Sequence, residues 1–365
     1  MNININNYCI IMAGGIGSRF WPLSKTSKPK QFIDVLGKGE TLIQSTFRRF
    51  ERICPRENIY IVTNGIYKDL INEQISNLNP NQIIAEPTRR NTAPCIAYAN
   101  FKIGKMNPNA NIIVSPSDHF IVDEDMFIET IEMGLEASKN SDILVTLGIK
   151  PTSPNTGYGY IQYIQSNFFS SKKQMNKVKL FTEKPDYDMA LQFISSGDFL
   201  WNSGMFIWSL KSINKSMKEL LPEVYNIFEK GNDIFNTPKE VDFIKVAYSA
   251  CPAISIDYGI MEKANNVYVI PSEFGWSDVG TWGAVHEVRQ KDKNDNSVVG
   301  KNIMIYDTKE CVINNSSTKL LVIQGLEKYI IVNTEDVLMI CEKDQEQRIK
   351  QFVTDVEVEK GSNFI

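Results

Sequence analysis

The stretch YCIIMAGGIGSRFWPLSKTSKPKQFID, residues 8–34, decides how the first half of the chain is organised. It opens with an apolar run over 8–13 that has the length and the β-branched content of a buried strand. Three glycines follow, and they let the backbone turn sharply away from the strand end. Because glycines carry no side chains, their N–H groups can face an anion at close range. The stretch therefore predicts a strand that ends in an anion-binding loop formed by Gly14, Gly15 and Gly17.

Two basic residues indicate that the anion is a polyphosphate. Arg19 follows the loop and Lys30 stands directly after Pro29, and two cations can neutralise several phosphate charges. Two other phosphate loops are excluded. A dinucleotide fingerprint requires a glycine where this chain has Phe20, and a Walker loop requires Gly-Lys-Ser/Thr where Ser18 and Arg19 follow the last glycine. The glycines alone would indicate only a tight turn, but the added cations predict a nucleoside triphosphate site.

Length and composition limit the possible classes of protein. The 365 residues suffice for two domains, and the 42% hydrophobic and 22% charged residues are ordinary for a globular chain. A net charge of −4 argues against nucleic acid as a partner. Six cysteines without a CxxC pair argue against zinc and disulfides, and two histidines argue against a histidine-based mechanism. No apolar run approaches the roughly 18 residues of a membrane span. We therefore expect a cytoplasmic protein with no membrane partner.

Strand-like and helix-like segments alternate through the first half of the chain. Thr92 is expected to cap one of the helices, with Pro94 inside its first turn. This rhythm predicts an α/β fold with a doubly wound, mostly parallel, Rossmann-like sheet that binds ligands beyond the carboxyl ends of its strands. The predicted strands cover 58–63, 82–85, 111–114 and 142–149, and helices are predicted at about 67–78 and up to 106.

The composition of the chain shifts near residue 290. The run KDKNDNS reads as a charged linker, and beyond it short strand-like runs are separated by turn residues. No strict internal repeat is apparent. We predict a large domain over 1–290 and a small C-terminal β-domain over 291–365, which ends in a helix at about 344–354.

Polar motifs follow two of the predicted strands. The segment EPTRRNTAP, residues 86–94, lies between a strand end and a helix start, where free N–H groups can meet an anion or a base edge. It could equally be a helix cap with two solvated arginines. The segment SPSDH, residues 115–119, places Asp118 after another strand. A lone aspartate there is usually a turn residue, but a carboxylate beside a triphosphate suits Mg²⁺.

Two segments suggest a sugar-phosphate site. In GYGYI, residues 157–161, a glycine permits close approach of a sugar. In FTEKP, residues 181–185, Glu183 can accept hydrogen bonds from sugar hydroxyls and Lys184 can pair with a phosphate. Taken alone, Glu-Lys before proline would be a solvated strand end.

Three more polar residues stand among apolar neighbours. Asn202 in WNSGMF is an amide in an apolar run and therefore needs hydrogen-bond partners. Asp257 in SIDYGIMEK either contacts a sugar or holds a turn. Asp278 in WSDVGTW lies between two tryptophans, which would hold a metal-binding carboxylate rigidly.

Together these motifs resemble the signature of the sugar-1-phosphate nucleotidyltransferases, in which GGxGxRxxP is followed by a Pro-Lys pair. The fuller form AGGIGSRFWPLSKTSKPKQF, and the segments EPxxRNTAP and FxEKP, look like the mannose-1-phosphate guanylyltransferase branch of that family. The resemblance covers roughly residues 8–340. It implies the nucleotidyltransferase, GT-A-like form of the α/β fold, with the catalytic domain over 1–290.

The resemblance also implies roles for individual residues. The implied catalytic residues are Arg19, Lys30, Asp118 and Asp278, of which Asp118 and Asp278 are the Mg²⁺ ligands. The implied nucleotide-binding residues are Ala13, Gly14, Gly15, Gly17, Arg19, Lys30, Glu86, Arg90, Asn91, Thr92, Pro116 and Asp118. The implied sugar-phosphate-binding residues are Gly159, Glu183, Lys184, Asn202 and Asp257.

The implied reaction transfers GMP from GTP to α-D-mannose 1-phosphate, with Mg²⁺ as cofactor, in a homodimer. The nucleophile is a phosphate that is ionised at neutral pH, so no general base is required. Longer relatives continue into a cupin-like isomerase domain whereas this chain ends at Ile365, so we expect a monofunctional transferase. Two alternatives stay open: a nucleotidyltransferase of the GDP-heptose or dTDP/UDP-glucose type, and a non-catalytic nucleotide-sugar sensor. An NAD-dependent oxidoreductase is disfavoured by the missing fingerprint glycine.

Overall fold

The computed structural model describes residues 3–169 and 174–365, and this part of the chain forms two compact units. The first unit contains the chain up to Gly14 together with residues 47–117 and 121–276. The second unit contains residues 15–46, 118–120 and 277–365. Each unit is thus built from segments that are distant in the sequence. Two short strands, β5 (Phe120–Ile121) and β11 (Trp276–Ser277), lie where the chain passes from one unit to the other.

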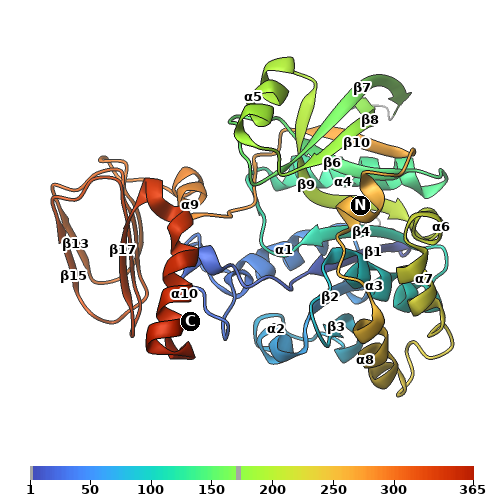
Figure 1. Ribbon diagram of the computed structural model, residues 1–365, viewed down its shortest axis with the longest axis horizontal. Coiled ribbons are helices and arrows are strands. Elements are labelled where there is room, and N and C mark those ends of the chain that lie inside the picture. The colour runs from blue at the N-terminus through green and yellow to red at the C-terminus, as the bar shows by residue number, and fades with distance from the viewer. Residues whose placement is uncertain (1–2, 170–173) are drawn as a thin grey trace. The chain divides into compact units, whose positions relative to one another are not determined.

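A mixed sheet of nine described strands forms the centre of the first unit, in the order β3-β2-β1-β4-β9-β6-β10-β8-β7 (Figure 1). The strands β3, β2, β1 and β4 are parallel, and β6 is parallel to β10. Strand β9 runs antiparallel between β4 and β6, and β7 and β8 pair antiparallel at one edge. The strands are β1 (Asn7–Met12), β2 (Ile59–Asn64), β3 (Ile83–Glu86), β4 (Asn111–Pro116), β6 (Leu144–Ile149), β7 (Gly159–Phe169), β8 (Gln174–Glu183), β9 (Phe199–Ser209) and β10 (Val267–Ser272).

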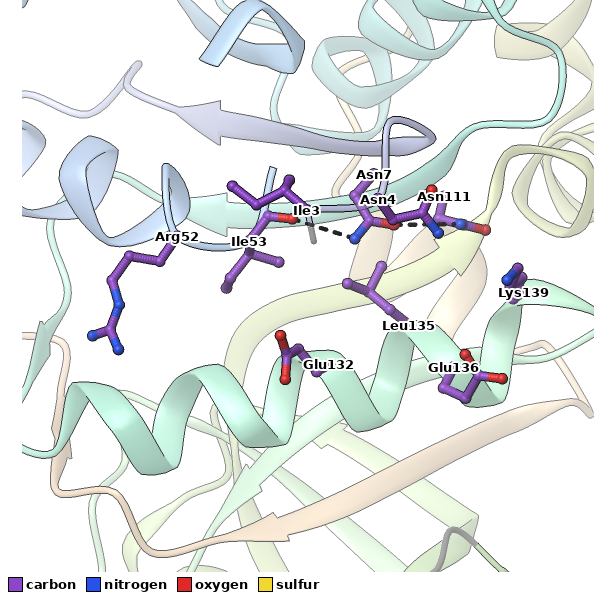
Figure 2. Close-up of a pocket in the computed structure, with 10 residues that line it drawn as sticks. All are labelled: Ile3, Asn4, Asn7, Arg52, Ile53, Asn111, Glu132, Leu135, Glu136 and Lys139. Atoms are coloured by element: carbon purple, nitrogen blue, oxygen red, sulfur yellow. Dashed lines mark hydrogen bonds between the residues drawn. The ribbon is translucent and has the colours of Figure 1, made fainter. Parts of the chain in front are cut away.

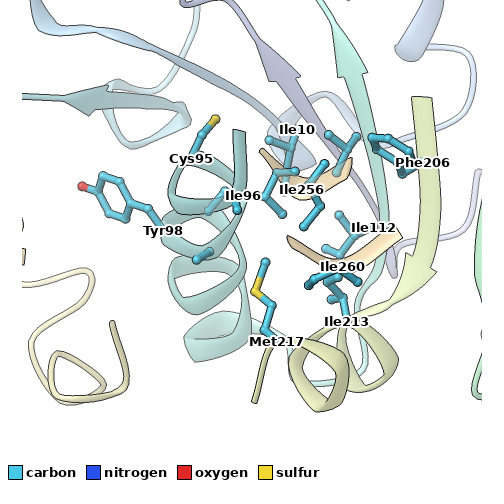
Figure 3. Packing of buried hydrophobic residues seen from close by; sticks show 14 of the residues in the cluster. Ile10, Cys95, Ile96, Tyr98, Ile112, Phe206, Ile213, Met217, Ile256 and Ile260 are labelled. Carbon is cyan, nitrogen blue, oxygen red and sulfur yellow. The ribbon is translucent and has the colours of Figure 1, made fainter. Parts of the chain in front are cut away.

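Helices cover both faces of this sheet. Successive strand residues point to opposite faces, so neighbours along β9 show which helix lies on which side. Phe206 packs in the apolar cluster that contains α3 (Figure 3), as does Trp208. Ile207, between them, meets α4 at Gly134. The helices are α1 (Leu42–Phe50), which joins the two units, and α2 (Lys68–Gln74), α3 (Thr92–Met106), α4 (Glu124–Lys139), α5 (Tyr187–Ser196), α6 (Leu210–Leu220), α7 (Pro222–Glu229) and α8 (Glu240–Ala250).

The predicted fold class, an α/β sheet with helices on both faces, is confirmed. The sheet is more mixed than the mostly parallel sheet expected, because β9 is inserted antiparallel and β7 and β8 extend one edge. A strand-like run of residues does not show which way the strand runs in the sheet, so the antiparallel strands could not be deduced from the pattern. The predicted cap of α3 is wrong by one residue. The N-cap is Asn91, whose side chain accepts a hydrogen bond from the backbone N–H of Thr92 at 2.9 Å.

The C-terminal part of the second unit is a short coil of parallel strands (Figure 1). Ile303 pairs with Leu321 and Val312 pairs with Ile330, so β13 and β14 each lie beside a strand that comes eighteen residues later. The final strand, β17, turns back and pairs antiparallel with β16. The strands are β12 (Ser297–Gly300), β13 (Ile303–Tyr306), β14 (Val312–Asn315), β15 (Leu321–Gln324), β16 (Tyr329–Asn333) and β17 (Leu338–Glu342).

This coil is a structural repeat in a part of the chain whose sequence has no strict internal repeat. Asn315 and Asn333 are register partners, both are buried, and the Asn333 amide donates to the Asn315 side-chain oxygen at 2.9 Å. Such a stacked pair satisfies two buried amides from successive turns of the coil. The repeat was missed because the described strands give only about two coils, and few residues other than these asparagines are identical between them.

One apolar cluster ties the rest of the second unit together. It joins the segment after the glycine loop to α9 (Trp282–Val288), to the strand coil and to the C-terminal helix α10 (Ile349–Lys360). Between β17 and α10 the chain forms a short helical segment, η7 (Lys343–Arg348). The predicted C-terminal helix is therefore confirmed, although its α-helical part begins and ends later than expected. The fully or nearly fully buried members include Phe20, Trp21, Val279, Trp282, Val312, Ile330 and Ile349.

Two negative expectations can be compared with the described residues. None of the helices in this part of the chain combines the length and apolar character needed to cross a bilayer. All six cysteines are buried and free, as expected for thiols that act as small apolar side chains.

Candidate active site

The glycine loop leads into a short helical turn, η1 (Ser18–Phe20), whose N-cap is Gly17. Gly17 has φ of 70°, which favours glycine, and a Cβ at this position would overlap the Cβ of Lys30. The Gln31 amide donates to the carbonyl of Gly15 at 3.0 Å. The loop is therefore folded back onto the Pro-Lys segment, and the missing side chain at Gly17 allows Lys30 to approach.

Lys30 is a buried cation, with only 3% of its surface exposed. Its Nζ donates to Oδ2 of Asp118 at 2.9 Å and to the backbone carbonyl of Asp278 at 2.7 Å. Burial alone would raise the pKa of the Asp118 carboxyl, but the charge of Lys30 and its hydrogen bond outweigh burial and lower that pKa. Three residues that the motifs predicted to act together therefore meet around one ammonium group.

The turn that carries Asp278 is conformationally unusual. Val279 has φ of 45°, in a region that a β-branched residue rarely adopts, and its side chain is fully buried in the apolar cluster. Oδ1 of Asp278 accepts a hydrogen bond from the N–H of Gly280 at 2.9 Å. Packing of Val279 thus holds a turn that fixes the backbone and the carboxylate of Asp278.

Arg19 is held by a residue from the far end of the chain. Its Nε donates to Oε1 of Gln347 at 3.2 Å. The guanidinium makes this one hydrogen bond to residues 3–169 and 174–365. Its two terminal nitrogens therefore remain as a pair of donors. The sequence contained no sign of this contact, because 328 residues separate the two partners.

In the first unit, Glu86 ends β3 beside the start of the glycine loop. A Cβ on Gly14 would lie 3.8 Å from Oε2 of Glu86, and the Tyr248 hydroxyl donates to Oε1 at 3.0 Å. Burial raises the pKa of Glu86 to about 7, and the hydrogen bond from Tyr248 only partly offsets this shift. Tyr248 lies on α8 outside every motif, and its role could not be foreseen.

The segment after Glu86 is anchored on two sides. Arg90 donates through Nε to the carbonyl of Tyr248 at 3.0 Å, and the Thr92 hydroxyl accepts from the N–H of Ile256 at 2.9 Å. Asn91 has φ of 67°, in the left-handed region that asparagine tolerates better than most residues. Arg90, for which a solvated arginine was the alternative to nucleotide binding, donates to α8 and thereby gives the segment a fixed shape.

The predicted sugar side centres on a hydrogen bond between Asn202 and Asp257. The Asn202 amide donates to Oδ1 of Asp257 at 2.9 Å, and its oxygen accepts from the N–H of Gly204 at 3.1 Å. The partners expected for an amide in an apolar run are therefore present. The pKa of Asp257 is raised to about 6, mainly by burial and to a lesser extent by the negative charge of Glu183.

Glu183 and Lys184 lie beside this pair. Lys184 Nζ is 2.5 Å from Oε1 of Glu183, and the charges of Glu183 and Asp257 contribute to a raised pKa of Lys184, although partial burial alone would lower it. A Cβ on Gly159 would collide with Oε2 of Glu183. The five residues predicted for the sugar phosphate therefore occupy one neighbourhood in the first unit.

Ala13 and Pro116 frame the loop at the sheet end. Ala13 is buried, and its backbone bonds to β2 through the carbonyl of Val62 and the hydroxyl of Thr63. Pro116 is the register partner of Met12 on β1. Both therefore lie at the carboxyl ends of parallel strands, as the class of fold predicts.

The donor set at Asp118 and Asp278 can be tested against a magnesium ion. Residues 3–169 and 174–365 contain no group of three or more His, Cys, Asp or Glu side chains placed to share a metal. A protein-only cage is therefore absent from the described chain. Mg²⁺ is commonly held by one or two carboxylates together with substrate phosphates. The carboxylate of Asp118 and the backbone carbonyl of Asp278 both contact Lys30, so the chain supplies two aspartates that fit such an arrangement.

A pocket of about 160 Å³ lies elsewhere in the first unit (Figure 2). It is lined by Asn7 and Asn111, the first residues of β1 and β4, and by residues of α4 such as Glu132 and Glu136. This is the amino end of the parallel strands, whereas Ala13, Glu86 and Pro116 stand at their carboxyl ends. The pocket therefore does not belong to the candidate site.

A glycine loop that follows a strand, together with a buried lysine that contacts two aspartate residues, is typical of enzymes that transfer nucleotidyl groups. The chain belongs to the nucleotidyl transferase family, whose model matches residues 8–295. Residues 300–356 match a second family, the MannoseP isomerase/GMP-like beta-helix domain, which accounts for the coil of parallel strands.

Among its relatives, the chain is 36% identical over 366 residues to a mannose-1-phosphate guanylyltransferase of Salmonella montevideo, covering 98% of this chain and 75% of the relative. It is 34% identical to the alginate biosynthesis protein AlgA of Pseudomonas fluorescens, covering 94% of this chain and 71% of the relative. A crystal structure described as a mannose-1-phosphate geranyltransferase from Thermus thermophilus has a TM-score of 0.86 at 28% identity, over 97% of this chain and 100% of that one. The predicted resemblance is therefore confirmed.

Proposed function

We propose that this protein transfers the guanylyl group of GTP to α-D-mannose 1-phosphate and releases pyrophosphate. A phosphate oxygen of the sugar phosphate forms a bond to the α-phosphorus, the bond to the bridging oxygen of the β-phosphate breaks, and the products are GDP-mannose and pyrophosphate. The observation that carries the proposal is the position of Lys30, a buried cation between the carboxylate of Asp118 and the carbonyl of Asp278 at the end of a glycine loop.

The residues need only align the substrates and neutralise charge. The attacking phosphate is already ionised, so no protein base or nucleophile is involved. We assign the triphosphate to the N–H groups of Gly15 and Gly17, to the terminal nitrogens of Arg19 and to Lys30. Fixed donors aimed at the charge that develops in the transition state can supply much of the catalysis.

The metal ligands in this proposal are Asp118 and Asp278. A bound Mg²⁺ would neutralise triphosphate charge and polarise the phosphoryl group. Lys30 keeps the Asp118 carboxyl ionised, as its lowered pKa indicates, and the hydrogen bond from Gly280 keeps the Asp278 carboxylate in one orientation. Both carboxylates are thus supported by the chain itself.

We assign the base to the neighbourhood of Glu86, Arg90, Asn91 and Thr92. Guanine presents two adjacent donors, N1–H and the N2 amino group, and an ionised carboxylate accepts from both. Adenine presents one donor and one acceptor on the same edge and would leave a buried oxygen of Glu86 unpaired, which is costly. This chemistry favours GTP over ATP. Ala13, Gly14 and Pro116 complete the proposed nucleotide contacts.

We assign the sugar phosphate to the neighbourhood of Gly159, Glu183, Lys184, Asn202 and Asp257. Carboxylates and an amide suit sugar hydroxyls, and the Lys184 ammonium suits the phosphate. These contacts do not by themselves separate mannose from other sugars, so another sugar 1-phosphate remains the alternative substrate.

Pyrophosphate release tests the proposal and its alternatives. GTP, ATP, UTP and dTTP are each combined with mannose 1-phosphate, glucose 1-phosphate and a heptose 1-phosphate in the presence of Mg²⁺. Release confined to GTP with mannose 1-phosphate supports the proposal. Release with another pair of substrates would contradict the specificity, and folded protein that is silent throughout would support a nucleotide-sugar sensor instead.

We further propose a homodimer that forms through the C-terminal β-domain. Leu338 and Ile340 of β17 are 54% and 53% exposed, and Val322 on β15 is 57% exposed, so strands of the coil present apolar side chains outward. Light scattering should give twice the chain mass, and Ile340→Lys should shift the protein towards the monomer. A monomeric wild type at micromolar concentration would contradict this part of the proposal.

The remaining assignments complete the proposal. The division at about residue 290 separates a catalytic domain over 1–290 from the β-domain over 291–365, and limited proteolysis near the polar run 290–296 tests it.

We place the enzyme in the cytoplasm, which suits six free, buried thiols and a nucleoside triphosphate substrate. Fractionation of cells that produce the protein tests the location.

A further inference from the structure

The segment that leaves the strand coil contacts Arg19 of the candidate triphosphate site and the start of α9, both in the second unit. Two consecutive residues of η7 are involved. Glu346 accepts a hydrogen bond from the N–H of Gly283 at 2.8 Å, at the start of α9, which follows the Asp278 turn. Gln347 accepts from Nε of Arg19 at 3.2 Å.

This segment is fixed from both ends. Ile349, which begins α10, is fully buried in the same apolar cluster as Phe20 and Trp282. Beyond α10, the backbone carbonyl of Phe364 accepts from Nε1 of Trp21 at 2.7 Å. Gln347 itself is exposed, so its place is set by its neighbours and its side chain is available for the contact with Arg19.

The chemistry of a glutamine suits this place. The side-chain oxygen of Gln347 accepts a hydrogen bond from one N–H group of Arg19. Because the amide is neutral, it does not compensate the positive charge of the guanidinium. The two terminal nitrogens then remain as a fork that matches the oxygens of a phosphate. A carboxylate in the same position would form an ion pair with Arg19 and compete with the phosphate.

We propose that Gln347 is a positioning residue for nucleotidyl transfer, which holds Arg19 by a neutral acceptor so that its terminal nitrogens stay free for the triphosphate. The inference rests on the proposed role of Arg19, and it gives the C-terminal segment a part in the chemistry of the active site.

The test compares Gln347→Glu with Gln345→Glu. Both glutamines lie on η7, both are exposed, and both variants add one negative charge, but the side chain of Gln345 makes no hydrogen bond to any other described residue. We expect Gln347→Glu to raise the KM for GTP about tenfold or more with a smaller change in kcat, because the new ion pair must break when the triphosphate binds. Gln345→Glu should behave like the wild type, and the thermal midpoints of the two variants should agree.

Two further readouts separate positioning from a general structural effect. Raising the ionic strength should narrow the difference in KM between the two variants, since exposed ion pairs are screened by salt. In an Arg19→Ala background, Gln347→Ala should have no further effect on kcat/KM for GTP, whereas in the wild type it should lower this ratio about tenfold.

The outcomes keep the two proposals apart. Wild-type protein that releases no pyrophosphate contradicts the proposed function. Active wild type in which Gln347→Glu and Gln345→Glu have the same KM for GTP, or in which Gln347→Ala is equally harmful without Arg19, contradicts the positioning role and leaves the proposed function standing.

Discussion

Nζ of Lys30 lies 2.9 Å from Oδ2 of Asp118, so the two side chains form an ion pair within the protein. Lys30 is almost completely buried, while the side chain of Asp118 is about one-third exposed. The chain's own groups therefore hold the cation in place, with the carboxylate within reach of solvent. An arrangement fixed in advance loses little free energy to reorganisation during the reaction, which is the basis of electrostatic catalysis.

Replacing Lys30 tests this arrangement. We expect Lys30→Met to lower kcat/KM for GTP by about a hundredfold or more, because the triphosphate loses a fixed cation. The variant also leaves the Asp118 carboxylate without its partner, which should lower the free energy of unfolding by about 1–3 kcal/mol at neutral pH. The lowered pKa of Asp118 stabilises the folded wild type above about pH 4. The difference in free energy of unfolding between wild type and Lys30→Met should therefore narrow as the pH falls below that value.

The control for this variant is Lys28→Met, because Lys28 is exposed and forms no ion pair with a described residue. It should leave activity and urea unfolding unchanged. Equal activity of the two variants would remove Lys30 from the catalytic machinery.

Asp278→Asn tests the metal role. The amide keeps the size of the side chain and can still accept from the N–H of Gly280, so we expect the fold to persist. Turnover should fall about a hundredfold or more, and the Mg²⁺ concentration for half-maximal rate should rise. Asp344→Asn, at an exposed position of the second unit, is the matched control. Near-normal turnover of a folded Asp278→Asn protein would argue against the assignment.

Glu86→Gln tests the buried carboxyl at the proposed base site. Its pKa is raised to about 7, so the folded protein binds a proton that the unfolded chain has already released between about pH 4.5 and 7. Wild-type stability should therefore decline as the pH rises through this range. In the absence of nucleotide, the variant should be more stable than the wild type by up to about 3 kcal/mol at pH 8 and by little at pH 4.5.

The same carboxyl should make GTP binding depend on pH. If ionised Glu86 accepts from guanine, the KM for GTP should rise as the pH falls below about 7, and this dependence should disappear in Glu86→Gln. Glu73→Gln is an exposed control in the same unit. A KM for GTP that changes equally with pH in wild type and in Glu86→Gln would show that another group is responsible.

The glycine loop offers an internal comparison between Gly17 and Gly15. Gly17→Ala places a side chain at φ of 70° and against Lys30, so it should lower stability by about 1–3 kcal/mol and greatly reduce activity. A Cβ on Gly15 would meet no atom within 4 Å, and its φ is not in the left-handed region. Gly15→Ala should therefore cost less stability, as measured by thermal unfolding. Equal losses in the two variants would contradict the packing described here.

Local patterns predicted much of the fold. The apolar runs gave the strands β1 to β4 to within a residue or two at most ends, and the motifs singled out Lys30, Asp118 and Asp278, which lie together in the structure. These predictions succeeded because strand periodicity, glycine turns and loop chemistry act over short distances along the chain.

Features that depend on distant contacts could not be predicted. The direction of β9, the coil in the C-terminal domain and the partners Tyr248 and Gln347 depend on which segments meet in space. Val279 shows the same limit, because its unusual backbone angle is imposed by burial in an apolar cluster drawn from four parts of the chain. Asn315 and Asn333 were the one available clue, since identical buried amides eighteen residues apart mark successive coils.

The most direct test of the account is product analysis with the wild-type protein, GTP, mannose 1-phosphate and Mg²⁺. The account predicts GDP-mannose and pyrophosphate in equal amounts, with both absent when either substrate is withheld. Binding of GTP and mannose 1-phosphate by folded protein without either product would contradict the central claim.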